Sequence, residues 1–526
     1  MSFMMSKRPR GLLAAHKQAA RSKDNEPIVT DLYVEQIEEP DEFHSPNSSS
    51  YKKRRLSPTN EFAQRQERST ADVEVWEDIK ELFSNAVDKY EAELPEEAVE
   101  LFRQVIHESD RLLRLYPVGN LNRLPCERTS LTSGGYRIPF YCSPIGRTRD
   151  PFPIRDPIRA TDPLTTFHYV YGTSMLLLGK ILEAFPALSK PVEPVGTPAF
   201  YLAALDVLED GENASHSISS HKFLPEDWRL AVSVGRTLIC LADEKLRRLT
   251  QSPTAAPLVN FQDDLWPKDS AFGPSFSRRP PLTRRVTLPP MTPHEIMLQA
   301  TDQFSRAMLH MPHPKRTRRH HDSNMETDMS LRLNDEMDGP PTMPGLGTKS
   351  RKHLKYLRPR VLYTIANDVL SIADRMQTAS EREAWAKWAD EVFMQMELEE
   401  QTSENWTYPI AIGRGRCWLI IGSTRFEAIE SRIESGEQAL DSDEAEGARD
   451  ALLRVVEQLE KAQRNQSTGL AMLQDPFSDV SPMLGEAFVT LATLTPEGPM
   501  KEQFFARAAA EGINVDEADE AMDEGV

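Results

Sequence analysis

Hydrophobic residues recur every three or four positions between Thr70 and Pro117, and this spacing predicts two amphipathic helices folded back on each other. The apolar face of the first helix runs from Val75 to Tyr90. Ser69, with an acidic residue three positions later, suggests a capping box at its start. The second helix begins at Pro95, a residue suited to a first helical turn. A hairpin of this kind cannot bury both its faces alone, so we expect further helices stacked against it.

The same helical period returns along the rest of the chain. We expect helices over residues 162–185, 198–209, 225–249, 292–308, 359–377, 380–396, 405–433 and 443–464, with a final pair within 481–510. Thr292, Pro293 and Glu295 predict a capping box with a first-turn proline, and Ser380 with Glu383 suggests another box. No segment reads convincingly as a strand. The predicted class is therefore all-α, with helices arranged in pairs.

The first hairpin also has features of a tetratricopeptide repeat. Tyr90, Ala98 and Phe102 resemble the tyrosine, small residue and phenylalanine of that repeat, although the first interval is one residue short. The connections between later helices are unequal, so the repeat has no fixed period. We therefore predict a degenerate tetratricopeptide-like solenoid of helical hairpins, with a disordered N-terminal tail and internal loops.

Composition divides the chain into helical and loop-like parts. Proline occurs 39 times, and the mean hydropathy is −0.50. We predict a disordered tail of basic and acidic residues over 1–69, a first helical half over 70–311 with a loop insertion at 118–161, a disordered basic insertion over 312–353, a second helical half over 354–510, and an acidic tail over 511–526.

Charge and cysteine content exclude several classes of function. The net charge of −19 makes direct nucleic-acid binding unlikely, because such binding relies largely on neutralising phosphates. The four cysteines include no CxxC pair, which argues against a disulfide framework or a zinc finger. No uninterrupted run of about 18 apolar residues occurs, so we expect no membrane association.

Three short clusters of lysine and arginine are candidates for a nuclear import signal. The candidate residues are Lys7, Arg8 and Arg10, then Lys52, Lys53, Arg54 and Arg55, and then Lys315, Arg316, Arg318 and Arg319. Import receptors hold extended basic peptides in acidic grooves, so these clusters predict an import receptor as a partner and the nucleus as the location. The alternative interpretation is that the clusters belong to solvated tails.

The sequence contains no recognisable active-site motif. It lacks a phosphate-binding P-loop, a dinucleotide fingerprint, a zinc-protease helix and a nucleophile elbow. The stretch from Gly413 to Arg416 has two interpretations, contact with phosphate or RNA and helix packing, and its place in an apolar helical pattern favours packing. His320 and Asp322 match the His-x-Asp of iron oxygenases, yet they sit in a basic loop. We therefore predict no catalytic residue, no bound cofactor and no metal site, and the protein is not expected to be an enzyme.

The aromatic pair Trp385 and Trp388 has two possible roles. Their three-residue spacing suits either a base-stacking platform or two anchors in a helical core. The acidic net charge favours the core.

Two parts of the chain resemble a known family. The start reads Ser6-Lys7-Arg8-Pro9-Arg10-Gly11-Leu12, and the hairpin contains Leu82-Phe83, Ala98-Val99-Glu100-Leu101-Phe102-Arg103 and Val105-Ile106-His107-Glu108-Ser109-Asp110-Arg111. These stretches resemble the fungal enhancer-of-translation-termination family, whose members open with a Lys-Arg-Pro-x-Gly-Leu stretch and then enter a similar hairpin. This chain departs from the family at Leu13-Ala14-Ala15-His16, where the family is rich in glycine and lysine, and in its long insertions.

The resemblance implies a nuclear, all-helical, tetratricopeptide-like protein without catalytic activity. Members of the family support correct translation termination and take part in hypoxic and sterol-linked gene regulation. Their partner is a 2-oxoglutarate and iron-dependent oxygenase of the prolyl-hydroxylase type, for which one member is a nuclear import adaptor and inhibitor.

A helical adaptor would bind its partner through exposed side chains on the concave face of the array. Tyr90, Arg103, His107 and Arg111 are the candidates in the first hairpin. The alternative is a general ribonucleoprotein or translation scaffold that binds RNA through its basic tails.

Overall fold

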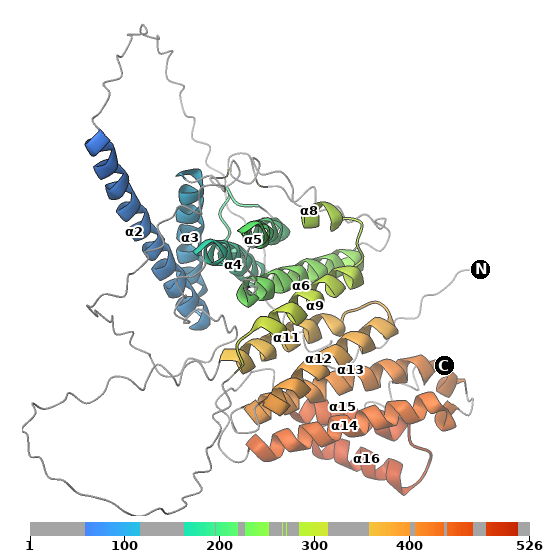
Figure 1. Cartoon of the computed structure of the whole chain (residues 1–526). Helices are drawn as coiled ribbons and strands as arrows, with labels where there is room; N and C mark the ends of the chain where they lie inside the picture. Colours follow the sequence, from blue (N-terminus) through green and yellow to red (C-terminus); the bar gives the residue numbers. More distant parts are fainter. Residues whose placement is uncertain are drawn as a thin grey trace, which may run out of the picture. The chain divides into compact units, whose positions relative to one another are not determined.

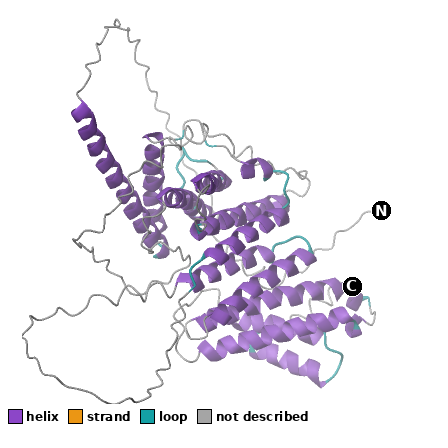
Figure 2. Cartoon of the chain, in the orientation of Figure 1, coloured by secondary structure: helices purple, strands orange, loops and turns teal. Residues whose placement is uncertain are grey.

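The computed structural model describes residues 58–115, 163–194, 196–218, 227–251, 266, 270, 283–313, 357–399, 406–435, 439–466 and 480–513. All the regular secondary structure in these ranges is helical, and they contain no strand (Figure 2). The predicted all-α class is confirmed. The chain divides into two compact units, Met1–Glu67 and Arg68–Val526, and almost all the described residues belong to the second.

The helices are labelled in Figure 1. They are α2 (Pro58–Glu91), α3 (Pro95–Leu115), α4 (Pro163–Ala184), α5 (Pro198–Ile218), α6 (Trp228–Gln251), α8 (Thr283–Thr287), α9 (Pro293–His310), α11 (Leu357–Ala373), α12 (Ala379–Glu399), α13 (Thr407–Glu434), α14 (Asp443–Gln466), α15 (Val480–Thr493) and α16 (Pro499–Ala510). Short 3₁₀ turns cover Pro186–Leu188 and Ala439–Asp441.

Two helix boundaries differ by more than five residues from the prediction, and one helix was not predicted. Helix α2 begins at Pro58, so the tail predicted for residues 1–69 ends earlier and Ser69 lies inside the helix instead of capping it. Residues 58–69 lack an apolar stripe, but they begin with proline and are rich in Glu, Gln, Arg and Ala, which favour helix. Helix α5 continues past residue 209 to Ile218, and α8 lies in a stretch predicted to be a loop.

The predicted hairpin of α2 and α3 is confirmed. Between the two helices Glu93 adopts a left-handed conformation with φ of 58°, and the N–H of Leu94 donates to the carbonyl of Lys89, as in a helix C-cap. The rings of Phe83 and Phe102 lie 6.5 Å apart in an edge-to-face contact across the hairpin. Phe83 also meets Tyr169 of α4 at 6.2 Å. The next helix therefore covers the face that the hairpin cannot bury alone.

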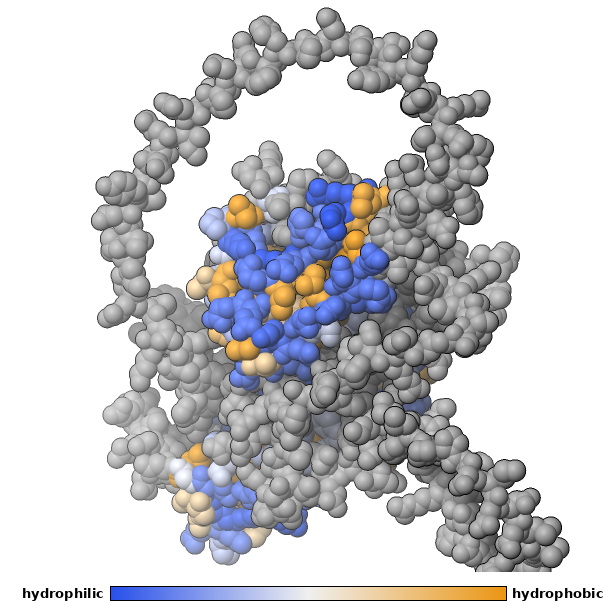
Figure 3. All heavy atoms as spheres, turned by 90° about the vertical axis from the view of Figure 1, so that its left-hand side faces the viewer, coloured by the Kyte–Doolittle hydropathy of each residue, from blue (hydrophilic) through white to orange (hydrophobic). Residues whose placement is uncertain are grey.

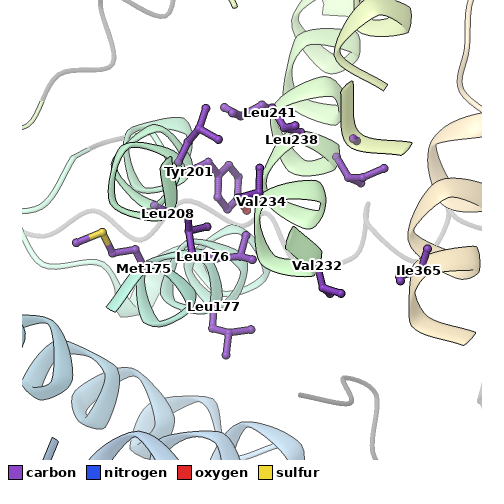
Figure 4. Close-up of a cluster of buried hydrophobic side chains, with 14 of the residues drawn as sticks. Met175, Leu176, Leu177, Tyr201, Leu208, Val232, Val234, Leu238, Leu241 and Ile365 are labelled. Atoms are coloured by element: carbon purple, nitrogen blue, oxygen red, sulfur yellow. The ribbon is translucent and has the colours of Figure 1, made fainter. Parts of the chain in front are cut away.

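Neighbouring helices in the chain pack against each other through most of the second unit. The main hydrophobic core takes residues from α2 to α12 and from the start of α13. Figure 4 shows part of this core, where Leu176 of α4, Tyr201 of α5 and Val234 of α6 gather together. Trp385 is buried in the core and Trp388 packs against it, so their prediction as core anchors is confirmed.

Buried arginines tie the helices before residue 313 to those after residue 357. Arg358 of α11 donates Nε and NH2 to the carboxylate of Glu399, at 2.7 and 3.0 Å, and NH1 to the carbonyls of Met308 and Met311. Arg236 of α6 pairs with Asp368 of α11 at 2.7 Å. The main core thus extends from the predicted half 70–311 into the predicted half 354–510, as far as the start of α13.

Of the three predicted capping boxes, the one at Thr292 is confirmed, and those at Ser69 and Ser380 are wrong. The Thr292 hydroxyl accepts the N–H of Glu295, whose carboxylate accepts the N–H of Thr292, at the start of α9. At α12 the cap is Thr378, which accepts the N–H of Glu381 at 3.3 Å. The sequence offers two overlapping Ser/Thr-x-x-Glu pairs there, and the helix starts at the earlier one. The side chain of Glu383 instead pairs with Arg425 of α13.

A second hydrophobic cluster joins α13, α14, α15 and α16. Within α15, Glu486 lies among its apolar residues, and one of its carboxylate oxygens is buried without a hydrogen-bond partner among the described residues. Burial, together with the negative charge of Asp374, raises the pKa of Glu486 from 4.5 to about 7. The folded protein therefore holds this carboxyl protonated at a pH where the unfolded chain ionises it.

Replacing Glu486 with glutamine should make the protein less sensitive to rising pH. A raised carboxyl pKa does not lower the free energy of unfolding well below pH 4.5, where the folded and unfolded states are both protonated. The loss of unfolding free energy grows as the pH rises to about 7. The wild type should lose on the order of 3 kcal/mol of unfolding free energy from this group across that window, and Glu486→Gln should not. Denaturant titrations of both proteins at pH 4.5 and pH 8 measure the difference. If the unfolding free energies of the two proteins differ by the same amount at both pH values, that result would contradict a raised pKa at Glu486.

Candidate partner-binding groove

A groove of about 690 Å³ lies between α2, α3 and the segment that follows α4. One wall comes from α2, where Val75, Asp78, Ile79 and Leu82 follow one another at helical spacing. The opposite side contains Lys190, Val192 and Glu193. The α3 residues that line the groove are Glu100, Arg103, Gln104, His107, Glu108 and Arg111, and Ser270 completes the lining.

The groove follows from the two-sided pattern of α3. Phe102, Val105 and Ile106 face the core and are fully buried. The lining residues of α3 occupy the intervening positions at steps of three and four, which places them along one edge of the same helix. Figure 3 views the molecule from the side on which α2 and α3 lie in Figure 1, and there hydrophilic and hydrophobic residues alternate over the described surface. The groove is therefore mixed in character, with an α2 wall that is apolar except for Asp78 and a charged α3 wall.

Arg103 is a structural residue at the base of the groove. Only 8% of it is exposed, and its Nε and NH2 donate to the two carboxylate oxygens of Glu193 at 2.6 and 2.7 Å. NH2 also donates to the carbonyl of Leu188, and NH1 to Glu100. Burial opposes the charged form, but the hydrogen bonds and the charge of Glu193 raise the pKa of Arg103 above its ordinary value. Arg103 therefore fastens the segment 188–193 to α3.

Glu100, the first of the α3 residues that line the groove, pairs with Lys190. Lys190 Nζ donates to Glu100 at 3.2 Å, and its backbone N–H donates to Glu193 at 2.9 Å. Although partial burial acts in the other direction, hydrogen bonds from Lys190 and Arg103 lower the pKa of Glu100. Glu100 is thus ionised at neutral pH and connects the two cations.

His107 and Arg111 are two of the exposed side chains on the α3 wall. Their side chains are 64% and 54% exposed. Both lie beside Glu108, with His107 Nδ1 3.2 Å and Arg111 NH2 2.7 Å from its carboxylate. Exposed pairs of this kind contribute little to stability, so a partner can replace them at small cost.

Tyr90 lies away from the groove lining. Its ring packs edge-to-face on Phe102 at 6.5 Å and contributes to the first core. Of the four residues predicted to bind a partner, the structure therefore brings Arg103, His107 and Arg111 together and separates Tyr90 from them. Partner binding by these residues stays a prediction.

The groove also contains residues that the sequence did not single out. Lys190, Val192 and Glu193 come from a short connection without periodicity, and no local pattern marks them. Val192 is 48% exposed and offers an apolar contact beside the charges. In the sequence, the only indication of this part of the groove is a valine, Val192, within a proline-rich stretch.

The import candidates lie outside the described residues. These are Lys7, Arg8 and Arg10, Lys52 to Arg55, and Lys315 to Arg319. His320 and Asp322 lie there as well.

Comparison with known proteins yields no family. No family model and no curated protein matches the sequence. Two crystal forms of the S. pombe nuclear import adaptor Nro1 match in structure, with 12% identity and TM-scores of 0.40 and 0.39, over 86% and 92% of this chain and 95% and 96% of theirs. A third structure, described as the hypoxic regulator of sterol synthesis Nro1, matches at 11% identity and a TM-score of 0.39, over 86% of this chain and 93% of its own. Identity at this level does not assign the chain to a family.

The described residues contain no arrangement suited to a metal. No three His, Cys, Asp or Glu side chains within the described ranges are placed to hold an ion. Burial raises the pKa of the Cys240 thiol to about 12, and it also raises the pKa of Cys417. None of the helices that the structure describes is both long and apolar enough to cross a bilayer.

The glycines of the Gly413 to Arg416 stretch serve helix packing, as predicted. A Cβ on Gly413 would meet the ring of Phe393 on α12, and one on Gly415 would lie 2.5 Å from Leu459 on α14. Arg414 pairs with Asp390 at 2.8 Å and Glu397 at 2.7 Å, so it crosses from α13 to α12. This stretch is part of the interior of a continuous helix and has no loop that could hold a phosphate.

Proposed function

We propose that this protein is a non-catalytic nuclear adaptor that binds a 2-oxoglutarate and iron-dependent oxygenase of the prolyl-hydroxylase type. The observation that carries the proposal is that the same residues show the family resemblance and line the groove. The stretch Ala98 to Arg111, which resembles the enhancer-of-translation-termination family, is also the stretch of α3 that forms the charged wall of the groove. In this proposal the adaptor supports translation termination and links the oxygenase to hypoxic gene expression.

The chemistry of the groove suits a peptide segment of a partner protein. Its volume of about 690 Å³ has room for several side chains, and its walls combine exposed Val192 with the exposed side chains of His107 and Arg111. Interfaces of this type pair a small apolar centre with complementary charges at the rim. The partner segment would place a carboxylate opposite Arg111 and an apolar side chain on the α2 wall.

Charge reversal at Arg111 should weaken oxygenase binding. Glutamate at this position faces the proposed carboxylate of the partner, and we expect about tenfold weaker binding, which corresponds to about 1.4 kcal/mol. The control is Arg464→Glu, an equal charge change at an exposed site on α14 that does not line the groove. Pull-downs from nuclear extract with full-length wild type and both variants, quantified by mass spectrometry, measure the effect.

The same pull-down also tests the alternative. Recovery of ribosomal or RNA-processing factors in place of an oxygenase would favour a general ribonucleoprotein or translation scaffold. Oxygenase recovered equally with both variants would place its binding site elsewhere on the protein.

Nuclear import should depend on at least one basic cluster. We expect the fluorescent full-length chain to accumulate in the nucleus and to be retained in the cytoplasm when the responsible cluster is deleted. The three deletions remove Lys7 to Arg10, Lys52 to Arg55 or Lys315 to Arg319. A cytoplasmic location of the intact chain would contradict the nuclear assignment.

A further inference from the structure

The short helix α8 covers an acidic side of α5. Asp206, Glu209 and Glu212 follow one another at steps of three and are all buried, with 4%, 7% and 7% of each residue exposed. Arg285 NH1 donates to Asp206 at 2.7 Å, and the backbone N–H of Arg284 donates to Glu209 at 3.2 Å. The guanidinium of Arg284 pairs with Glu212. Two adjacent arginine side chains therefore pair with Asp206 and Glu212, and a backbone N–H of α8 binds Glu209.

One apolar anchor and one lysine hold the end of α8. Leu288 is fully buried, and Lys245 of α6 donates to the carbonyls of Pro289, at 2.9 Å, and Met291. Val286 is 60% exposed, and Thr287 is exposed on the outer side. A threonine hydroxyl is thus presented to solvent directly beside the two arginines that dock the helix.

The sequence Arg284-Arg285-Val286-Thr287 has two arginines at the third and second positions before a hydroxyl. Arginine-directed protein kinases recognise this spacing, because acidic subsites of the kinase bind the two guanidinium groups. We propose that Thr287 is a phosphorylation site for an arginine-directed protein kinase and that the phosphate releases α8 from α5.

The modification is a simple phosphoryl transfer from ATP. A bond forms between Thr287 Oγ1 and the γ-phosphorus, and the bond from that phosphorus to the oxygen bridging it to the β-phosphorus breaks. The hydroxyl proton passes to a base of the kinase, and ADP leaves. No oxidant or reductant takes part.

Phosphate at Thr287 opposes docking in three ways. Thr287 ends α8, where its hydroxyl lies 3.0 Å from the carbonyl of Arg284, so a dianion there meets the negative end of the helix. The phosphate also lies one turn from Arg284 and competes with Glu212 for its guanidinium. It also adds negative charge to a region where two arginine side chains already face three carboxylates. A helix of five residues has few internal hydrogen bonds to resist this change.

Helix α6 provides an internal comparison, since Arg247-Arg248-Leu249-Thr250 has the same spacing. The carboxylate of Glu244 accepts hydrogen bonds from both of these arginines, and Leu246, directly before them, is buried. Entry of this segment into a kinase cleft requires unwinding the end of a 24-residue helix, whereas α8 has only five residues to unwind. Thr287 should therefore be modified faster than Thr250. A third match, Arg54-Arg55-Leu56-Ser57, lies outside the described residues.

The test uses the full-length chain, ATP and the catalytic subunit of a cyclic-AMP-dependent protein kinase. Site-resolved mass spectrometry should find phosphate on Thr287, at an initial rate about tenfold above that on Thr250. Wild type and Thr287→Ala, both treated with the kinase, are then compared by amide hydrogen exchange. The amides of residues 284–291 should exchange about tenfold faster in the phosphorylated wild type, while those in the first half of α6 remain equal.

Two outcomes overturn the proposal. If Thr287 stays unmodified in the full chain while Ser57 or Thr250 is phosphorylated, Thr287 is not a site in the folded protein. If Thr287 is phosphorylated and the exchange of residues 284–291 is unchanged, phosphate does not release α8. The variant Asp206→Asn, which removes the partner of Arg285, should accelerate exchange in α8 without phosphate and shows that the measurement reports undocking.

Discussion

Replacing Arg103 with alanine is expected to lower the free energy of unfolding by about 3–5 kcal/mol. The side chain of its partner Glu193 is only 3% exposed, and both of its carboxylate oxygens accept hydrogen bonds from Arg103, beside one from the N–H of Lys190. Removing the guanidinium leaves a buried carboxylate without its countercharge, which costs more than the pair itself contributes. Denaturant unfolding of the full-length variant measures the loss.

Arg111→Ala is the matched control, because it removes another arginine from the same helix. Its side chain is 54% exposed and its pair with Glu108 lies at the surface, so the expected loss is below about 1 kcal/mol. The double variant Arg103→Met with Glu193→Leu should recover much of the loss, since it replaces both charges with apolar groups of similar length. Equal small losses for Arg103→Ala and Arg111→Ala would show that the Arg103–Glu193 pair is not buried in solution.

The helices could be predicted because their burial is periodic. Each long helix packs an apolar face on the next. Apolar residues therefore recur in the sequence with a period of about 3.6 residues. Where no such face exists, the prediction fails. The first turns of α2 have no apolar stripe, and α8 is anchored by Leu288 and two arginines, so neither carries a period.

The candidate site was predictable only along a single helix. The steps from Arg103 to His107 and Arg111 are visible in the sequence and place all three on one edge of α3. The burial of Arg103 was not visible, because its partner Glu193 lies 90 residues away in an aperiodic connection. Tyr90 belongs to the stripe of α2, and from sequence alone a half-buried aromatic can either pack or bind. The structure shows its ring packed against Phe102, and partner binding by Tyr90 stays a prediction.

At the glycines of α13, in contrast, the sequence did indicate a contact with another helix, because glycine lowers the stability of a helix. Glycine inside a helix is disfavoured by about 1 kcal/mol relative to alanine, so two within one apolar pattern indicated either close helix approach or a local break in the helix. The structure confirms this approach at Gly413 and Gly415. The sequence did not indicate which helices approach, because that depends on the fold as a whole.

Replacing Phe393 with alanine should remove about 3–5 kcal/mol of stability, because the ring is fully buried and its loss leaves a cavity. The ring lies between Tyr363, whose centroid is 5.9 Å away, and the backbone of Gly413. Gly413→Ala alone should also destabilise the protein. Its methyl group would lie within 2.7 Å of Phe393 Cε1, and overpacking of about 1–3 kcal/mol outweighs the gain in helix propensity.

The two changes should partly compensate when combined, because the methyl group added by Gly413→Ala enters the space that the ring vacated. We expect the double variant to be more stable than Phe393→Ala by about 1 kcal/mol, which makes the interaction energy between the sites at least that large. Denaturant unfolding of the four proteins in this cycle gives the interaction energy. The matched control pairs Phe393→Ala with Gly415→Ala, whose methyl group would instead meet Leu459 of α14, and those effects should simply add. Additive losses in both cycles would contradict a direct contact between Phe393 and the backbone at Gly413.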